Sequence, residues 1–438
     1  MKTIYKSFLL ILFGCLMAIE LFAQVPEPAP PQSQPMALMN ATAHLGNGQV
    51  IQNAFILIEE GKITQVGDAT TARIDLQKYE QVDLSGKHVY PGLILPGTRV
   101  GLEDIGAVRA TRDHTEVGQF TPNVRSLIAY NTDSEIIATL RYNGILLVES
   151  VPGGGTLTGT SSVMALDGWN WEDAAYKKDI AVNLNWPIKK LPPRWWLNET
   201  KGRDNPNYKR TVDGLKVFLQ EAKSYSQMGT PTTVNLKFEA MKGVFSGEKI
   251  LHINAQKYHE IIESIQTAES FGIERIVLVG GRDAYYAKDF LKEHDIPVLI
   301  DDVHRLPARA EEDVDMPYKL PVLLTEAGIK VGLTYGGLMN SRNLPFYAGT
   351  VAGYGLGKEE ALKLVTSNTA DILGISGSTG TIASGKDANL VVSEGDLLDM
   401  RTSKITMALI KGRKLNLDNK QQVLYERFKK KYMKPTAE

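Results

Sequence analysis

Residues 86–94, GKHVYPGLI, mark the boundary between two kinds of sequence pattern, and this boundary decides the fold. Before it, residues 37–89 alternate apolar and polar residues in short segments that turn residues separate. Such alternation around turns is typical of β-hairpins. The same pattern returns near the C-terminus, at 377–396 and 403–416. We therefore expect the two β-rich ends of the chain to pair into one small β-sandwich around a long insertion.

The insertion, roughly Pro91 to Ile375, alternates apolar runs with polar, helix-like stretches. The helix-like stretch 255–272, for example, carries apolar residues at helical spacing. Repeated strand-then-helix order predicts a parallel sheet, and this length is sufficient for an eight-stranded α/β barrel. A doubly wound sheet is the alternative. The runs that we predict as strands are GILLVESV, TTVNLKF, KILHIN, RIVLVGG, PVLIDD and KVGLTY.

The composition excludes several classes of protein. The chain has 438 residues, 43% of them hydrophobic and 23% charged, with a net charge of −1. Such a chain is globular rather than disordered or fibrous, and it lacks the basic surface that nucleic-acid binding requires. Its single cysteine, Cys15, excludes a disulfide framework and any zinc site built from cysteines.

The N-terminus has the features of a secretory signal. Lys2 and Lys6 precede an apolar run that ends near Ala23, which predicts cleavage after this residue. The alternative is a lipoprotein signal, because residues 12–15, LFGC, are close to a lipoprotein cleavage box that would leave Cys15 lipidated. Either way we expect a periplasmic or envelope location, with membrane association only if Cys15 is lipidated.

The expected organisation follows from these patterns. It comprises a signal peptide (1–23), a proline-rich tether (24–36), a composite β-sandwich domain (37–90 and 376–416), a barrel (91–375) and a helical tail (417–438). In the tail, Leu424, Phe428 and Tyr432 repeat every four residues, which suits a helix docked on the body or on a partner.

The boundary segment resembles a known family. Residues 86–94 resemble the opening segment of the amidohydrolase superfamily, in which P-G-L-I-D-x-H-x-H supplies two metal ligands. The stretch 359–375, EEALKLVTSNTADILGI, and the stretch 380–392, GTIASGKDANLVV, resemble the last barrel helix and the return to the β-domain. The nearest branch is the imidazolonepropionase-like one. The resemblance implies a (β/α)8 barrel, a divalent metal such as zinc, and hydrolysis of C–N bonds other than peptide bonds.

The metal ligands that the resemblance implies are missing from this sequence. After PGLI, the aspartate position holds Leu95, and the two histidine positions hold Gly97 and Arg99. No two of the seven histidines in the chain are spaced as His-x-His. Glycine has no side chain to ligate a metal, and a guanidinium would repel a cation.

The later strands also lack the implied ligands. In the fifth strand Asn254 stands at the ligand position, and His252 would lie deeper in the barrel. The sixth strand offers Gly281, Arg282 and Asp283, and the eighth offers Thr334, Tyr335 and Gly336. We predict a degenerate centre without a metal or other cofactor. The alternative is that the strands are misaligned and that ligands of another kind exist.

Two groups of residues remain candidates for a site. Asp301, Asp302 and His304 follow the seventh strand and should lie at the barrel mouth, where they could act as acid and base. The alternative is loop capping and ion pairing with Arg305 and Arg309. The residues that we expect to line a binding pocket, with guanidinium groups for an anionic ligand, are Arg99, Asn254, Arg282, Asp283, Tyr335 and Arg342.

Together these features predict an exported protein of amidohydrolase fold that serves as a non-catalytic binding or partner subunit. Its partner would be a related amidohydrolase or a second copy of the chain. The alternative is an active metal-dependent hydrolase with an atypical site around His304, and only this alternative requires a divalent metal.

Overall fold

The structure is a computed structural model that describes residues 27–72, 74–229, 231, 233–307, 309 and 311–433, without the side chain of Trp195. The predicted signal peptide, and with it Cys15, lies outside the described residues. The described part of the tether is held against the body of the protein. Ala29 is buried, its N–H donates to Asp167 Oδ2 at 3.2 Å, and its carbonyl accepts from Arg413 at 3.1 Å.

The two ends of the chain meet in one β-sheet. Its path is β18-β17-β16-β5-β1-β2-β3, with β4 also paired to β1. The ends join where β5 and β16 pair antiparallel, with Val89 opposite Val392. The strands are β1 (Met36–His44), β2 (Val50–Glu59), β3 (Lys62–Asp68), β4 (Glu80–Asp83), β5 (His88–Pro91), β16 (Leu390–Ser393), β17 (Ile405–Ile410) and β18 (Arg413–Lys414).

The alternation seen in the sequence gives this sheet two apolar faces. Leu38 and Ile56 belong to one hydrophobic cluster, whereas the neighbouring residues Ala37, Phe55 and Leu57 belong to another. Alternate residues of a strand point to opposite faces, so the sheet separates these clusters. Strands from both ends of the chain thus pair as one sheet, while the sandwich arrangement itself stays a prediction.

The insertion forms a second eight-stranded sheet, in the order β15-β14-β13-β12-β9-β8-β7-β6. The sheet is nearly closed: β15 and β6 are adjacent, and the Thr334 hydroxyl donates to the carbonyl of Pro96. An α/β barrel is therefore confirmed. The strands are β6 (Leu93–Thr98), β7 (Ile145–Ser150), β8 (Leu157–Ala165), β9 (Ala175–Asn185), β12 (Ile250–Ala255), β13 (Ile276–Gly280), β14 (Val298–Asp301) and β15 (Val331–Thr334).

One strand departs from the expected parallel order. β8 runs antiparallel to both β7 and β9, whereas the other neighbouring strands of this sheet are parallel. Only six residues separate β7 from β8, too few for a crossover helix, so the chain turns back. The short strands β10 (Lys190–Leu191) and β11 (Arg203–Asp204) form a separate hairpin.

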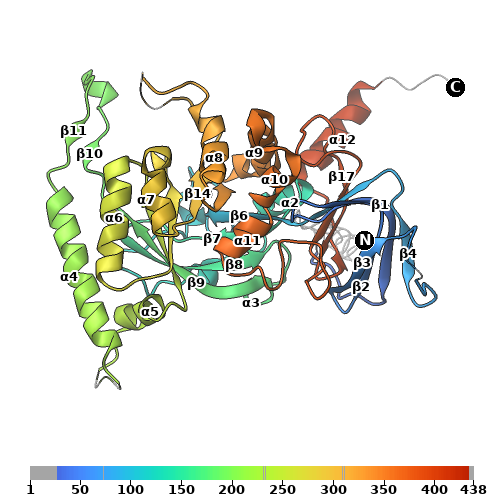
Figure 1. Cartoon of the computed structure of the whole chain (residues 1–438), viewed down its shortest axis with the longest axis horizontal. Helices are drawn as coiled ribbons and strands as arrows, with labels where there is room; N and C mark the ends of the chain where they lie inside the picture. The colour runs from blue at the N-terminus through green and yellow to red at the C-terminus, as the bar shows by residue number, and fades with distance from the viewer. Residues whose placement is uncertain are drawn as a thin grey trace, which may run out of the picture.

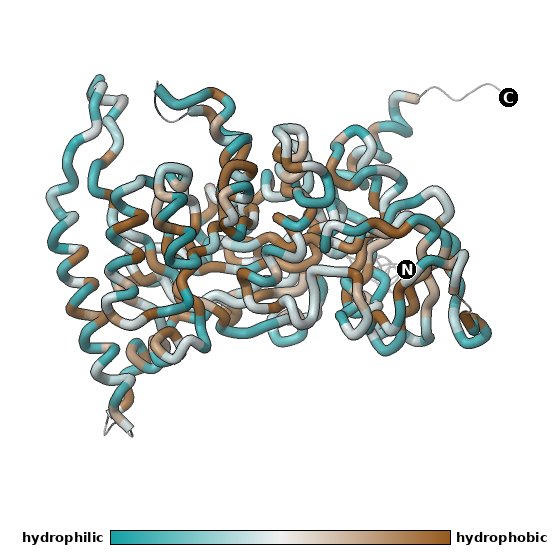
Figure 2. Tube along the Cα trace, in the orientation of Figure 1, coloured by the Kyte–Doolittle hydropathy of each residue, from teal (hydrophilic) through white to brown (hydrophobic). Residues whose placement is uncertain are grey.

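Helices cover the barrel, and α4 lies at the end of the molecule farthest from the β-domain (Figure 1). Figure 2 shows hydrophobic residues concentrated along the central strands and hydrophilic residues on the outer helices. The helices are α2 (Glu135–Tyr142), α3 (Trp171–Ala174), α4 (Tyr208–Ser226), α5 (Leu236–Phe245), α6 (Tyr258–Ser270), α7 (Lys288–Glu293), α8 (Met316–Glu326), α9 (Leu344–Val351), α10 (Lys358–Lys363), α11 (Ser367–Ile372) and α12 (Lys420–Tyr432).

One predicted strand is wrong. Residues 236–238 of the run TTVNLKF begin helix α5, and Asn235 caps this helix by accepting a hydrogen bond from the N–H of Lys237. The β-branched residues of this run end before Asn235, a residue that favours helix N-caps. The local capping signal therefore outweighs the short β-like pattern.

Charged side chains connect the barrel to the β-domain. Asp167 follows β8, is buried, and pairs with Arg141 of α2 and Arg413 of β18, each at 2.9 Å. On another side, His44 of β1 pairs with Glu359 of α10 at 2.7 Å. None of the helices in the described residues is long and apolar enough to cross a bilayer.

Candidate functional site at the barrel mouth

Seven of the eight barrel strands end on the same side, which we call the mouth. The loops after these strands carry most of the residues predicted from sequence. Active sites of such barrels lie on this side because the loops that follow the strands meet there. The strand ends and the side chains just below them are therefore the expected place of a site.

Gly97 lies near the end of β6, where the backbone turns with φ of +65°. Its N–H donates to Glu149 Oε2 of β7 at 3.0 Å. Arg99 follows β6 and pairs with Glu103 at 3.6 Å, with about half of its side chain exposed. The first barrel strand thus contributes a backbone donor inside the barrel and a guanidinium at its rim.

Glu149 and His252 form an ion pair inside the barrel. Their side chains, on β7 and β12, are 0% and 1% exposed, and His252 Nδ1 lies 3.2 Å from Glu149 Oε1. The Ser161 hydroxyl of β8 donates to the same carboxylate oxygen at 2.6 Å. Because β7 and β12 are not neighbours in the sheet, this pair spans the interior. His252 therefore lies deep in the barrel, as expected from its place in the strand.

The surroundings of Glu149 favour its charged form. Burial by itself raises the pKa of this carboxyl, but His252, the Ser161 hydroxyl and the Gly97 N–H together outweigh burial and hold the pKa below its ordinary value. His252 Nε2 is buried and has no hydrogen-bond partner among the described residues. Glu149 is therefore expected to carry a negative charge within the barrel.

Asp301 and Arg282 lie near each other at the mouth. Gln256 connects their loops, since its Nε2 donates to Asp301 Oδ2 at 3.4 Å and its Oε1 accepts from the N–H of Arg282 at 3.2 Å. Burial raises the pKa of Asp301, the nearby Arg282 lowers it and Asp302 raises it further. The Arg282 Nε is buried without a partner among the described residues. This corner combines a carboxyl that favours protonation with an incompletely satisfied guanidinium.

Asp302 and His304 share no hydrogen bond with Asp301 among the described residues, and a catalytic role for the three stays a prediction. Asp302 takes a left-handed backbone conformation, with φ of +50°. His304 Nε2 lies 2.6 Å from Thr350 Oγ1 of α9, and the ring meets Tyr347 edge to face at 4.5 Å. Burial lowers the pKa of His304, which favours the neutral imidazole.

Arg305 and Arg309 form ion pairs with other acidic residues of the mouth. Arg305 pairs with Glu312 at 2.6 Å, and Arg309 pairs with Asp283 at 2.9 Å. These arginines therefore bind the chain of the following loop and the end of β13, not Asp301 or Asp302. Asp283 is buried in this contact, so its carboxylate is already occupied.

The remaining predicted residues occupy separate parts of the mouth. Asn254 is half-buried in β12. Tyr335 follows β15, and its ring lies 5.4 Å from that of Tyr347. Arg342 is half-buried in the short helix η5 (Met339–Asn343). The structure thus brings Asp301 and Arg282 together and places Arg99 in another cluster; the pocket residues stay a prediction.

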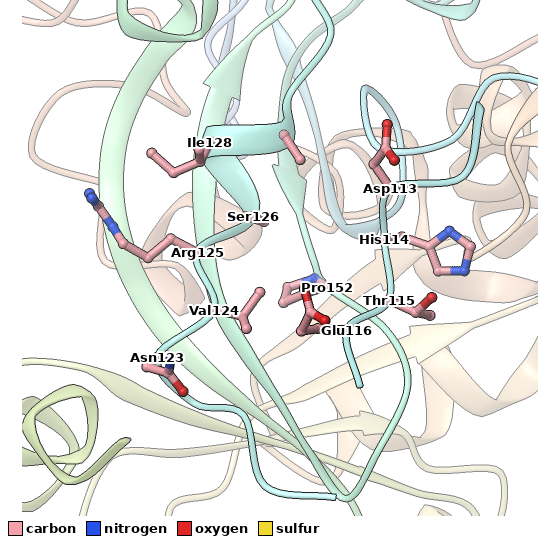
Figure 3. Close-up of a pocket in the computed structure, with 11 residues that line it drawn as sticks. Asp113, His114, Thr115, Glu116, Asn123, Val124, Arg125, Ser126, Ile128 and Pro152 are labelled. Atoms are coloured by element: carbon pink, nitrogen blue, oxygen red, sulfur yellow. The ribbon is translucent and has the colours of Figure 1, made fainter. Parts of the chain in front are cut away.

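A cavity of about 370 Å³ opens between two parts of the loop that joins β6 to α2 (Figure 3). In Figure 3 the His114 ring and the Arg125 guanidinium point to opposite sides, and Glu116 lies beside Pro152. Arg125 is held by Asp179 at 2.7 Å. Burial and the charge of Arg99 lower the pKa of His114. The residues that line this cavity are Asp113, His114, Thr115, Glu116, Asn123, Val124, Arg125, Ser126, Ile128, Ala129 and Pro152.

Comparison with known proteins agrees with this architecture. The sequence model described as the Amidohydrolase family matches residues 355–415. An amidohydrolase from Thermotoga maritima MSB8 has a TM-score of 0.77 at 25% identity, over 87% of this chain and 99% of that one. The family match and the solved structure are thus both amidohydrolases, and the fold of this chain is similar to theirs.

Two further solved structures share the fold at lower identity. A prolidase solved with N-methylphosphonate-L-proline has a TM-score of 0.53 at 17% identity, over 87% of this chain and 99% of that one. An adenosine deaminase from Xanthomonas campestris with bound zinc has a TM-score of 0.51 at 14% identity, over 92% and 99%. No curated protein matches the chain.

The donors at the mouth of this chain do not fit a metal centre. Within the part of the chain that the structure describes, no group of three or more His, Cys, Asp or Glu residues is placed to hold a metal ion. Divalent metals need several imidazole, thiolate or carboxylate donors that converge on one point. Here the first strand offers a backbone N–H, and the one histidine inside the barrel is paired with Glu149.

Sequence reasoning missed Glu149 and Ser161. A signal for Glu149 exists, because its strand, ILLVES, is buried at every position and a carboxylate in such a run needs a partner. The partner lies about a hundred residues further on, and nothing in the local pattern identifies it. Ser161 lies in the antiparallel strand that the repeated strand-helix order did not predict.

Proposed function

We propose that this chain is an exported, non-catalytic binding protein of the amidohydrolase superfamily, in its imidazolonepropionase-like branch, with a degenerate metal centre. The observation that carries the proposal is the link from the Gly97 N–H through Glu149 to His252. This link occupies the barrel interior beneath the mouth.

The chemistry of the link supports a role without metal-assisted hydrolysis. A bound cation activates water by lowering its pKa toward about 7, which requires ligands that leave one position open. His252 Nδ1 faces Glu149, and its Nε2 is enclosed. Arg99 at the rim adds a positive charge where the superfamily's first strand carries a ligand. The Glu149 carboxylate is thus contacted by groups of the chain itself, His252, the Ser161 hydroxyl and the Gly97 N–H.

The mouth retains features of a binding site. Arg282 and Asp301 present a guanidinium and a carboxyl on adjacent strand ends. The loop cavity, which has the volume of a small-molecule pocket, is lined by other residues and is a separate feature of the mouth. We infer a ligand with a carboxylate or amide group, whose oxygen would accept hydrogen bonds from the Arg282 guanidinium.

Metal analysis tests the proposal directly. The purified chain is incubated with Zn²⁺, Mn²⁺ or Fe²⁺, desalted and analysed for metal, beside a zinc-containing superfamily protein as positive control. We expect far less than one ion per chain. One tightly bound ion per chain at the mouth, removed by substitution of Asp301 or His304, would falsify the proposal.

Ligand screening tests the binding role. Thermal shift against small carboxylates, amides and dipeptides is expected to identify a stabilising compound whose effect is lost in Arg282→Gln. Arg210→Gln, at an exposed position of α4, is the matched control. Equal stabilisation of both variants would remove Arg282 from the site.

The second candidate function is a hydrolase with an atypical site at Asp301, Asp302 and His304. The raised pKa of Asp301 favours it, because a carboxyl that holds its proton can act as a general acid. This alternative requires a divalent metal and turnover of an amide substrate that Asp301→Asn abolishes.

The proposal also includes export from the cytoplasm and binding to a partner subunit. N-terminal sequencing of the protein from its native envelope distinguishes cleavage after Ala23 from a mature chain that begins at lipidated Cys15. The partner is a related amidohydrolase subunit or a second copy of the chain. Trp169 and Trp196 are largely exposed and could contribute to such a surface. Cross-linking in native envelope is expected to capture this partner, and a uniformly monomeric protein would contradict the idea.

A further inference from the structure

The last helix concentrates positive charge in a chain that is otherwise slightly acidic. Helix α12, KQQVLYERFKKKY, has five basic residues and one acidic residue, whereas the whole chain has a net charge of −1. Within the described residues, its ion pairs are Lys420 with Glu135 at 3.0 Å and Lys429 with Glu426 at 3.8 Å. Arg427, Lys430 and Lys431 form no ion pair there. The helix is therefore a local source of positive potential.

Apolar and aromatic side chains share one face of this helix. At 3.6 residues per turn, Leu424, Phe428 and Tyr432 follow one another at steps of about 40°, and Tyr425 lies about 20° beyond Tyr432. The apolar arc is therefore about 100° wide. Lys431 lies about 20° outside one edge of this arc and Lys429 about 40° outside the other.

This face is uncovered. Helix α12 buries none of its residues. Leu424 is 40% exposed, Phe428 50%, Tyr425 57% and Tyr432 72%. Its hydrogen bonds and ion pairs with α2 in the described residues lie in the first turn, where Lys420 pairs with Glu135 and the Thr139 hydroxyl donates to Gln421 at 2.9 Å. Figure 1 shows α12 at the edge of the molecule, next to the chain end.

We propose that α12 binds the surface of an anionic lipid bilayer, with its apolar arc in the headgroup region and its lysines against the phosphates. A helix with a narrow apolar face and a basic polar face lies in this interface. Aromatic rings with a polar edge favour the same depth. Each lysine near an anionic surface adds attraction that salt weakens. This contact does not need a lipid on Cys15.

The lysines that flank the arc favour a bilayer over an acidic protein groove. The Lys429 ammonium lies 5.6 Å from the ring centre of Tyr425, and that of Lys431 lies 4.9 Å from the ring of Tyr432. The ammonium groups therefore border the apolar arc, and their long flexible stems would let them reach headgroup phosphates when the rings enter the interface.

Vesicle co-sedimentation tests the proposal with the full chain. The vesicles contain phosphatidylcholine alone or with phosphatidylglycerol. We expect salt-sensitive binding to the anionic vesicles only. In the triple variant Lys429→Gln, Lys430→Gln and Lys431→Gln, this salt-sensitive binding should weaken about a hundredfold, from roughly fivefold per lysine. Phe428→Ser should also weaken it.

The control carries the same charge change elsewhere, as Lys209→Gln, Lys216→Gln and Lys237→Gln at exposed positions of α4 and α5. It should bind as the unmodified chain does. Binding through the apolar N-terminal segment would be insensitive to salt and equal in all variants. The proposal would be overturned if the chain showed no salt-sensitive binding to anionic vesicles, or if the control variant lost binding equally. It would also be overturned if α12 bound polyglutamate, DNA or a second copy of the chain but not vesicles.

Discussion

Replacing His252 with alanine is expected to destabilise the protein by about 3–5 kcal/mol, the usual cost of removing one partner of a buried ion pair. Without the imidazole, Glu149 keeps only the Ser161 hydroxyl and the Gly97 N–H, and its side chain remains fully buried. The measurement is urea unfolding at pH 7, read as a change in the free energy of unfolding. His259→Ala, at an exposed position of α6, is the control and should change stability by less than about 0.5 kcal/mol.

Two further measurements separate the ion pair from simple loss of packing. Adding Glu149→Gln to His252→Ala should cost about 1–3 kcal/mol less than the sum of the single changes, because the uncompensated charge is removed. In the intact protein the lowered pKa of Glu149 means that its contribution is present above about pH 4.5 and is lost as the pH falls through the folded-state pKa. In His252→Ala the destabilisation should instead shrink at acid pH, where the isolated carboxyl can take a proton. Additive single changes, with a cost that is independent of pH, would refute the ion-pair argument.

Three other predictions concern the contacts between the barrel and the β-domain. Gly349→Ala should cost about 1–3 kcal/mol in urea unfolding, because the added methyl would overlap the carbonyl oxygen of Leu398; an unchanged midpoint would contradict that packing. Asp167→Asn should cost about 3–5 kcal/mol because it leaves Arg141 buried without its counter-charge, and a change below about 1 kcal/mol would be inconsistent with this pair. Burial and the neighbouring histidine lower the pKa of His88, so its contribution is complete above about pH 6.5 and is lost on acidification. Between pH 7 and pH 5, the free energy of unfolding should therefore decrease less in His88→Asn than in the unmodified chain. The same pH dependence in both proteins would count against this role of His88.

The barrel strands and their order were accessible from sequence where periodicity was strong. Residues 249–254, 275–281, 297–302 and 330–335 all fall in or beside strands, because each run is short, apolar and followed by turn residues. The failures have local causes. Asn235 provides a helix cap inside a β-like run, and the polar strand β8 runs against its neighbours, which no periodicity reveals.

The sequence predicted where single residues of the candidate site lie but not which of them contact each other. The place of Gly97 and Arg99 at the end of the first barrel strand followed from the segment GKHVYPGLI, and the depth of His252 followed from strand alternation. The role of Glu149 could not be derived in the same way. It depends on a partner from a distant strand, and contacts of that kind arise from closure of the barrel.

The pairing of β5 with β16 also affects how the chain is made. These strands are separated by about 300 residues, so the edge of β5 has no partner until nearly the whole chain has emerged. Contacts at such separation form slowly, and an unpaired strand edge invites aggregation in the meantime. Synthesis of this protein therefore leaves a long interval during which its first domain is incomplete, and a chaperone that covers the β5 edge would be most needed in that interval.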